Sequence, residues 1–203
     1  MILPDIAVCM IVKDEAHCIE RCLNSLIRKV SRICIVDTGS TDNTLGILDY
    51  YSRAHIHTHW QIEKASFVDF STARNHSIRM AVNAGWIFII DADELVLPES
   101  WVAIHELLFS TPKPPISVAL PRHQWTDMEM THYIGPYPDH HIRIWQNGRG
   151  VQYQGKVHEQ PCGGQVWDNL VYLDTAHIEH FNRAYRSGDG WAKINQLYKQ
   201  LSQ

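Results

Sequence analysis

The first ninety residues alternate between short apolar runs and longer amphipathic stretches, and this alternation constrains the fold more than any other feature. The run 6–12 is continuously apolar, as expected for a strand that is buried on both faces. The next stretch repeats apolar residues at helical spacing, and the same succession recurs up to residue 90. Strands are predicted over 6–12, 33–36, 56–60 and 86–90, and helices over 19–30, 44–53 and 69–84. The pattern predicts an α/β fold with a parallel sheet that helices cover on both faces.

After residue 91 the pattern changes to shorter elements. A helix predicted over 99–109 ends at the proline-rich breaker 111–115. Beyond it, apolar pieces are separated by Gly, Pro and Asn, which is typical of antiparallel strands and loops. Strands are predicted over 116–120, 141–145, 151–153 and 170–173, and a last helix over 189–201. The length of 203 residues suits one domain whose second part is small and antiparallel.

Composition and charge exclude several classes of protein. The formal net charge of −4 argues against nucleic-acid binding through broad phosphate neutralisation. No apolar run approaches the roughly 20 residues of a membrane span, and the N-terminal residues lack the pattern of a secretory signal. The five cysteines show no paired spacing, so we expect reduced thiols in a cytoplasmic protein. A zinc site at Cys18 and Cys22 is disfavoured because no second cysteine pair follows.

Carboxylates directly follow three of the predicted strands. Asp14 and Glu15 follow the first strand, Asp37 follows the second, and Asp91 and Asp93 follow the fourth. In an open α/β sheet, ligands bind outside the carboxyl ends of the strands. Acidic residues also cap helices, which is the alternative interpretation at each position. Acids at three strand ends along one edge nevertheless favour a binding site there.

Particular residues at this edge carry a specific chemistry. Asp91 and Asp93 leave a buried strand one residue apart, and two such carboxylates can share a hard divalent cation. Asp37 stands beside the tight turn that Gly39 allows, and its carboxylate could accept hydrogen bonds from a nucleobase. Arg74 offers a planar fork of donors that suits phosphate or carbonyl oxygens, although a lone helix arginine is more often solvated.

Four segments in this order resemble the family 2 glycosyltransferases of the GT-A fold. The segments are MIVKDE at 10–15, DTGSTDNT at 37–44, ARN at 73–75 and DADE at 91–94. Three later segments resemble one subgroup, which includes bacterial lipopolysaccharide-core β-glucosyltransferases and peptide S-glycosyltransferases. They are RIWQN at 143–147, YQGKVHE at 153–159 and HIEH at 177–180. The chain ends soon after the last predicted helix, where many relatives continue, so acceptor-recognition or assembly elements are expected to be missing or supplied by a partner.

The resemblance implies roles in binding a nucleotide sugar. Asp37 is expected to read the nucleobase, and Asp14 and Glu15 to line the same pocket. Arg74 would contact the base or the diphosphate, and His158 would orient one of these two groups. A UDP-sugar is the favoured donor on the resemblance alone.

The resemblance also implies a metal cofactor, Mg²⁺ or Mn²⁺. Asp91 would face both the ribose and the metal, and Asp93 would ligate the metal. His180, with His177 as the second choice, would complete the metal shell. The metal would neutralise the leaving nucleoside diphosphate.

An inverting transfer needs one general base, which takes a proton from the acceptor hydroxyl. Glu159 is the predicted base because it ends one of the matching segments, and Glu94 and Asp139 are its rivals. The chain is predicted to be a single GT-A domain over 1–203, with a nucleotide-sugar half at 1–97 and an acceptor half at 98–203. The leading acceptor is a bacterial glycan such as a lipopolysaccharide core sugar. Contact with the inner face of a membrane is expected only for a lipid-linked acceptor.

Other interpretations of the sequence remain open. The chain could be a non-catalytic subunit that binds sugar nucleotides, or a glycosyltransferase that acts on a peptide side chain. A haloacid-dehalogenase-like phosphatase is disfavoured because its paired acids follow the first strand, and a dehydrogenase because no Gly-rich fingerprint follows the first strand. Three alternating histidines would share one strand face, where packing or solvent exposure is favoured over metal binding. They are His55, His57 and His59.

Overall fold

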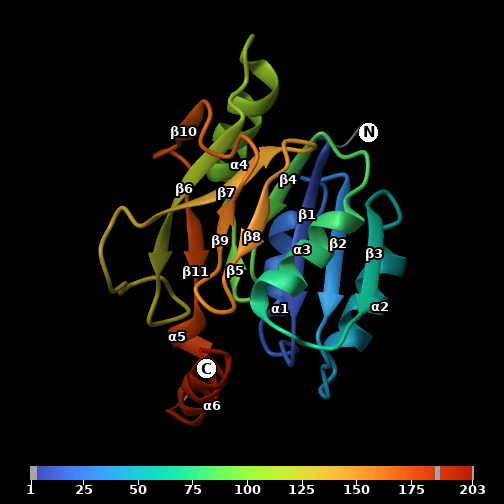
Figure 1. Ribbon diagram of the computed structural model, residues 1–203, viewed down its shortest axis with the longest axis vertical. Helices are drawn as coiled ribbons and strands as arrows, with labels where there is room; N and C mark the ends of the chain where they lie inside the picture. The colour runs from blue at the N-terminus through green and yellow to red at the C-terminus, as the bar shows by residue number, and fades with distance from the viewer. Residues whose placement is uncertain (1–3, 186–187, 203) are drawn as a thin grey trace.

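The computed structural model describes residues 4–185 and 188–202, and one nine-stranded sheet runs through it (Figure 1). The strand order is β3-β2-β1-β4-β7-β6-β11-β5, and β10 pairs with β6 beside this path. The first four strands run parallel to one another. They are β1 (Ile6–Val12), β2 (Arg32–Asp37), β3 (His59–Lys64) and β4 (Trp86–Ile89).

Helices cover both faces of the parallel part because its strands are apolar on both sides. The side chains of Val8 and Met10 face a core that includes α1 (Ile19–Leu26), α2 (Thr44–Ala54) and α4 (Pro98–His105). On the opposite face, Ala7 and Cys9 pack with residues at the end of α3 (Phe70–Met80). In Figure 1, α3 lies in front of β1 and β2, and α1 and α2 lie behind them. The predicted α/β class with a mostly parallel sheet is confirmed.

The second half of the chain continues the same sheet. β7 (His140–Gln146) pairs antiparallel with both β4 and β6 (Ser117–Gln124). β10 (Leu170–Tyr172) and β11 (Ile178–His180) both run parallel to β6, one beside each end of it, so the prediction of antiparallel strands holds only in part. β5 (Glu94–Leu95) pairs antiparallel with β11. The remaining elements are the hairpin of β8 (Gln152–Gln154) and β9 (Gln160–Cys162), the π-helical turn η1 (Glu106–Ser110), α5 (Asn182–Tyr185) and α6 (Gly188–Leu201).

Several predicted boundaries shift for local reasons. The third strand begins at His59 because α2 continues to Ala54 and a turn then binds Thr58 N to His55 O at 3.1 Å. His55 and His57 therefore precede the strand, and the predicted stripe of three histidines on one strand face does not form. The helices predicted over 19–30 and 69–84 end at Leu26 and Met80, each followed by a turn with a positive-φ residue. Among the described residues, none of the helices combines the length and apolarity needed to cross a membrane.

Candidate active site

A cavity of about 420 Å³ opens at the carboxyl ends of β1, β2 and β4. Six of the predicted site residues line it: Glu15, Arg74, Asp91, Asp93, Glu159 and His180. The rest of its wall comes from the strand ends, β6, the segment before α3, and α3, α5 and α6, and includes Lys13, Thr38, Phe67, Phe70, Arg122, Asn182 and Tyr198. The expectation that the strand-end acids meet at one edge is met by Glu15, Asp91 and Asp93.

Arg74 joins two carboxylates across this cavity. Its Nη1 and Nη2 donate to Asp91 Oδ1 and Oδ2 at 2.8 and 3.2 Å, and its Nε donates to Glu159 Oε1 at 2.6 Å. α3 aims Arg74 at the end of β4 because the helix begins at Asp69, whose side chain accepts from Thr72 N. Burial alone would raise the pKa of Asp91, but the charges of Arg74 and Arg143 and the hydrogen bonds from Arg74 together outweigh burial and lower that pKa. The pair therefore stays ionised.

Arg143 forms a second ion pair behind the first. Its Nη2 donates to Glu94 Oε1 at 2.7 Å, and Glu94 Oε2 accepts from Asp91 N at 2.9 Å. Both side chains are buried, and neither lines the cavity. No role was predicted for Arg143, although an arginine inside the apolar strand 142–145 indicates a buried partner. This pair fixes the turn that carries Asp91 and Asp93.

Asp93 and His180 meet where β11 reaches the turn after β4. His180 Nε2 lies 3.5 Å from Asp93 Oδ1, and Phe181 N donates to Asp93 O at 2.9 Å. Burial disfavours the charged imidazolium, but the hydrogen bond with Asp93 and the charges of Asp93 and Glu94 together outweigh burial and raise the pKa of His180. His180 Nδ1 is buried and has no hydrogen-bond partner among the described residues. A carboxylate oxygen and an imidazole nitrogen at this spacing are donors that a divalent cation accepts.

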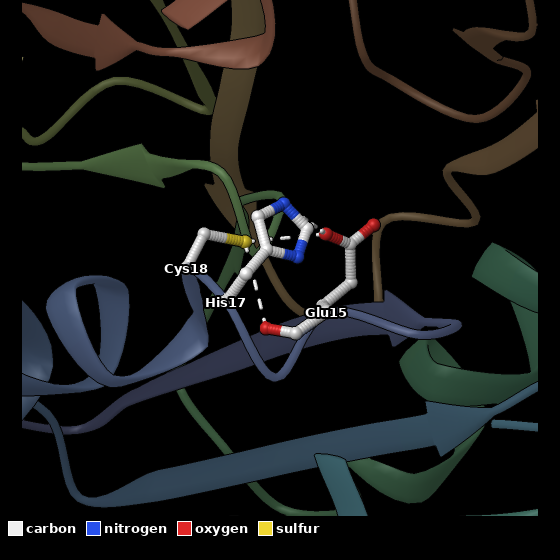
Figure 2. A group of neighbouring side chains, drawn as sticks. All are labelled: Glu15, His17 and Cys18. Carbon is white, nitrogen blue, oxygen red and sulfur yellow. Dashed lines mark hydrogen bonds and ion pairs between the residues drawn. The ribbon is translucent and has the colours of Figure 1, made fainter. Parts of the chain in front are cut away.

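Two acids follow β1, Asp14 and Glu15, and of these two only Glu15 lines the cavity. Figure 2 shows its carboxylate beside His17 and Cys18 at the start of α1. Cys18 Sγ lies 3.2 Å from Glu15 Oε2, and His17 Nε2 lies 4.0 Å from the same oxygen. Burial, followed by the charge of Glu15, raises the pKa of the Cys18 thiol, so the thiol donates to the carboxylate. Cys22 Sγ contacts Asp91 O at 3.4 Å instead of joining Cys18.

Asp14 and Asp37 hold the loop after β2 and do not line the cavity. Asp14 Oδ1 accepts from Thr41 N at 2.6 Å, and this hydrogen bond lowers the pKa of Asp14. Asp37 Oδ1 accepts from Gly39 N and Ser40 N, both at 3.0 Å. Asp37 Oδ2 is buried and has no hydrogen-bond partner among the residues that the structure describes.

The other candidates lie outside the cavity wall. His158 is exposed, has a φ of 53°, and packs its ring 5.3 Å from that of Tyr198 on α6. Asp139 lies 2.7 Å from Arg122 Nη2 and 3.1 Å from a nitrogen of His141, so this rival of Glu159 is already paired. Of the three predicted bases, Glu159, Glu94 and Asp139, only Glu159 lines the cavity. His177, the second choice for the metal, lies in a separate group with His123 and Glu179.

Known proteins resemble this chain in sequence and in fold. The family model described as glycosyl transferase family 2 matches residues 7–181. The chain is 31% identical over 158 residues to the TPR repeat-containing protein Synpcc7942_0270 of Synechococcus elongatus, and 30% identical over 169 residues to the SPbeta prophage-derived glycosyltransferase SunS of Bacillus subtilis. These alignments cover 77% and 78% of the chain but only 35% of each relative, so the chain spans about a third of their length.

Solved structures share the fold at low sequence identity. S. aureus TarS, in complex with UDP-GlcNAc, superposes with a TM-score of 0.63 at 13% identity, over 97% of this chain and 66% of TarS. Mannosyltransferase PcManGT from Pyrobaculum calidifontis, in complex with GDP-Man and Mn²⁺, has a TM-score of 0.51 at 16% identity, over 72% of this chain and 45% of that one. These likenesses confirm the predicted GT-A fold, and the family model confirms the predicted family. The chain belongs to glycosyl transferase family 2.

Proposed function

We propose that the chain is a catalytic domain that transfers a sugar, with inversion, from a nucleoside-diphosphate sugar to an acceptor hydroxyl. The single observation that carries this proposal is the cavity in which Arg74, Asp91, Asp93, Glu159 and His180 converge. It lies at the carboxyl edge of a parallel sheet, where α/β folds bind nucleotides. The nucleotide-sugar complexes of TarS and PcManGT support a donor of this class.

The nucleobase is proposed to bind beside the loop after β2. Asp37 Oδ2 has no hydrogen-bond partner within the described part of the chain, and this supports a role as acceptor for a base N–H, because a buried oxygen without a hydrogen bond is costly. Asp14 would keep this loop in shape, and Glu15 would line the pocket wall. UDP remains the favoured donor nucleotide. His158 would reach the donor only at the rim, where it packs on Tyr198.

Asp93 and His180 are proposed to hold Mg²⁺ or Mn²⁺, since their oxygen and nitrogen atoms already lie side by side. Asp91 would join them only when one of its two oxygens leaves Arg74. When bound, the cation would neutralise charge on the leaving diphosphate. Arg74 would then have donors available for a phosphate oxygen, which fits the role predicted for it.

Glu159 is proposed as the general base. The acceptor oxygen attacks the anomeric carbon, the bond from that carbon to the diphosphate breaks, and the acceptor proton passes to Glu159. The hydrogen bond from Arg74 Nε to Glu159 Oε1 fixes this carboxylate at the cavity wall and supports the assignment. A general base of this kind contributes about 10²–10⁴-fold to the rate.

The acceptor is proposed to bind on the 98–203 side of the cavity, and the donor on the 1–97 side. A glycan such as a lipopolysaccharide core sugar is the leading acceptor, and a peptide side chain is the second. A cytoplasmic location, with membrane contact for a lipid-linked acceptor, belongs to the same proposal. The alternative function is a subunit that binds sugar nucleotides without turnover.

Thermal unfolding with UDP, GDP and dTDP, each with and without Mn²⁺, tests the donor site. A ligand present at about 100 times its Kd adds about 2.7 kcal/mol to the free energy of unfolding. We expect UDP with Mn²⁺ to raise the Tm, the rise to require the metal, and Asp93→Ala to abolish it. Asp168→Ala, at an exposed aspartate outside the cavity, is the matched control. No rise with any nucleotide in the folded protein would contradict the proposal, and nucleotide binding without transfer to any glycan or peptide would favour the subunit.

A further inference from the structure

Three metal-ligating side chains, His123, His177 and Glu179, gather outside the active-site cavity. One ligand atom of each lies within 4.8 Å of those of the other two. His123 on β6 and Glu179 on β11 are direct partners in the parallel register of these strands. Their chain neighbours Arg122 and His180 line the cavity, and successive side chains of a strand point to opposite faces. The group therefore lies on the other face of the sheet from the donor site.

The spacing of these atoms is close to that of a tetrahedral metal shell. His123 Nδ1 lies 3.2 Å from Glu179 Oε2. Two ligands of a zinc ion, each about 2.0–2.2 Å from the metal, lie about 3.4 Å apart in a tetrahedral site. A ring nitrogen of His177 lies within 4.8 Å of both atoms, and it would have to move closer to complete the shell. Two imidazoles and one carboxylate are a ligand set that zinc accepts, with water in the fourth position.

Hydrogen bonds from neighbouring groups hold the side chains of His177 and Glu179 in place, as such bonds do for the ligands in metal sites. His177 Nε2 lies 3.0 Å from the carbonyl oxygen of Asp174, and because a carbonyl can only accept, the ring proton is on Nε2. That leaves a lone pair on Nδ1 for a metal. Trp125 Nε1 donates to Glu179 Oε2 and holds this buried carboxylate in place. The ring of His123 stacks on that of Tyr137, with centroids 4.3 Å apart. Loss of a hydrogen-bond partner of a metal ligand typically costs about 10–100-fold in metal affinity.

A second group of ligand atoms, Glu15, His17 and Cys18, is a poorer candidate (Figure 2). Its carboxylate belongs to the wall of the active-site cavity. Its cysteine is a thiol that donates to that carboxylate, so a metal would have to displace a proton from sulfur. This group serves as an internal control.

We propose that His123, His177 and Glu179 bind a zinc-class divalent cation that has a structural role. Binding replaces the hydrogen bond from His123 Nδ1 to Glu179 by two metal–ligand bonds, and the proton moves from Nδ1 to Nε2 through solvent, so that the ring binds the metal as a neutral imidazole. The cation joins the end of β6 to the segment that leads into β11, and so secures the aromatic loop between Trp125 and Asp139. This inference goes beyond the transfer reaction and does not depend on it.

Cobalt(II) is the probe, because its visible absorption reports a tetrahedral shell that contains imidazole. The titration uses the metal-stripped chain with Asp93→Asn, which weakens the proposed donor-site metal. We expect one equivalent of Co²⁺ to bind, Zn²⁺ to displace it, and Zn²⁺ to raise the Tm. His177→Gln and His123→Gln should each weaken binding by more than the about 10–100-fold that loss of an outer-shell partner costs, because each removes a ligand. His177 is partly exposed, so the His177→Gln variant keeps the test valid if the His123→Gln variant does not fold.

Two further variants are matched controls. His140→Gln removes a nearby histidine that pairs with the Asp174 side chain, and His17→Gln removes a ligand of the second group. Both should bind Co²⁺ as the parent does. The proposal is overturned if the parent binds no Co²⁺, if His177→Gln binds it unchanged, or if His17→Gln alone abolishes binding.

Discussion

Arg74 is the residue on which the charge balance of the active site depends. Its side chain is 11% exposed and contacts the carboxylates of Asp91 and Glu159, which come from segments far apart in the sequence. Removing one partner of a buried ion pair leaves an uncompensated charge, at a cost of about 3–5 kcal/mol. Variants of the site are therefore informative only when they keep the acceptor atoms that Arg74 needs.

Glu159→Gln meets this condition, because the amide oxygen can still accept from Arg74 Nε. We expect this variant to lose about 10²–10⁴-fold in kcat, since it cannot take a proton, and to keep the Tm rise with UDP and Mn²⁺. The measurement is sugar transfer once an acceptor is in hand, together with the thermal shift. Asp139→Asn, at the rival carboxylate outside the cavity, should stay within a few-fold of the parent. A larger loss in Asp139→Asn than in Glu159→Gln would reverse the assignment.

His141 makes stability depend on pH. Burial, followed by the charges of Arg143 and Arg122, lowers the pKa of His141 from 6.5 to about 4. Between these values the unfolded chain binds a proton that the folded chain does not, so the free energy of unfolding falls as the pH falls from 6.5 to 4. The full shift corresponds to about 3 kcal/mol, which is an upper bound.

Urea unfolding at pH 7 and pH 4 measures this effect. His141→Gln should lose less stability than the parent between these pH values, by up to about 3 kcal/mol. The exposed His57→Gln is the control and should follow the parent. Equal pH dependence in all three proteins would show that His141 is not held neutral by burial.

At the scale of elements, the sequence predicts a strand correctly where the strand's own residues form an apolar run. β1, β2 and β4 are buried on both faces, so each is a continuous apolar run, and Asp91 and Asp93 could be placed at a strand end. β3 is an edge strand with the polar sequence HWQIEK, and its register is set by pairing with β2. β5, β9 and β11 have two or three residues each and exist through their partners.

The same limit applies to the active site. Arg74 and Glu159 are 85 residues apart, and the hairpin of β8 and β9 that brings them together has no strong local pattern. Arg143 was missed as a partner of Glu94 for the same reason. Backbone N–H groups of the loop after β2 bind one carboxylate oxygen of Asp14 and one of Asp37, a supporting role that the sequence pattern did not indicate, and their contacts with the nucleotide stay predictions. Only the folded chain distinguishes an acid that faces a cavity from one that holds a loop.

The β8–β9 hairpin carries Glu159, and the segments on either side of it approach closely at Gly150 and Gly164. Gly164 has a φ of +51°, and a Cβ there would overlap Arg149 O and lie 2.7 Å from the carbonyl carbon of Gly150. Gly148 has a φ of +78°, but a Cβ there would meet nothing within 4 Å. Gly164→Ala should lower the free energy of unfolding by about 2–4 kcal/mol, and Gly148→Ala by about 1–2 kcal/mol. Urea denaturation of the two variants checks the difference, and equal losses would show that the overlap is relieved.

Strand pairing and core contacts connect the two proposed halves of the molecule, 1–97 and 98–203. β4 from the first half pairs with β7 from the second within one sheet. Trp101 of α4 packs edge-on against Phe88 of β4, with centroids 5.6 Å apart, and its Nε1 donates to Ser25 O of α1 at 2.8 Å. The halves therefore share a core, and we expect the chain to unfold in one transition that far-UV circular dichroism and tryptophan fluorescence report at the same urea concentration.

Trp101→Phe tests this cooperativity, because it weakens the contact between the halves and removes the hydrogen bond to Ser25. The variant should lose about 1–3 kcal/mol, and the midpoints from both probes should move together. Trp167, which is 66% exposed, supplies the control, and Trp167→Phe should change stability by less than about 0.5 kcal/mol. Two separate transitions in Trp101→Phe would mean that the halves fold independently. A single transition would mean that a ligand in the donor cavity stabilises the acceptor side as well, because both sides belong to one cooperative unit.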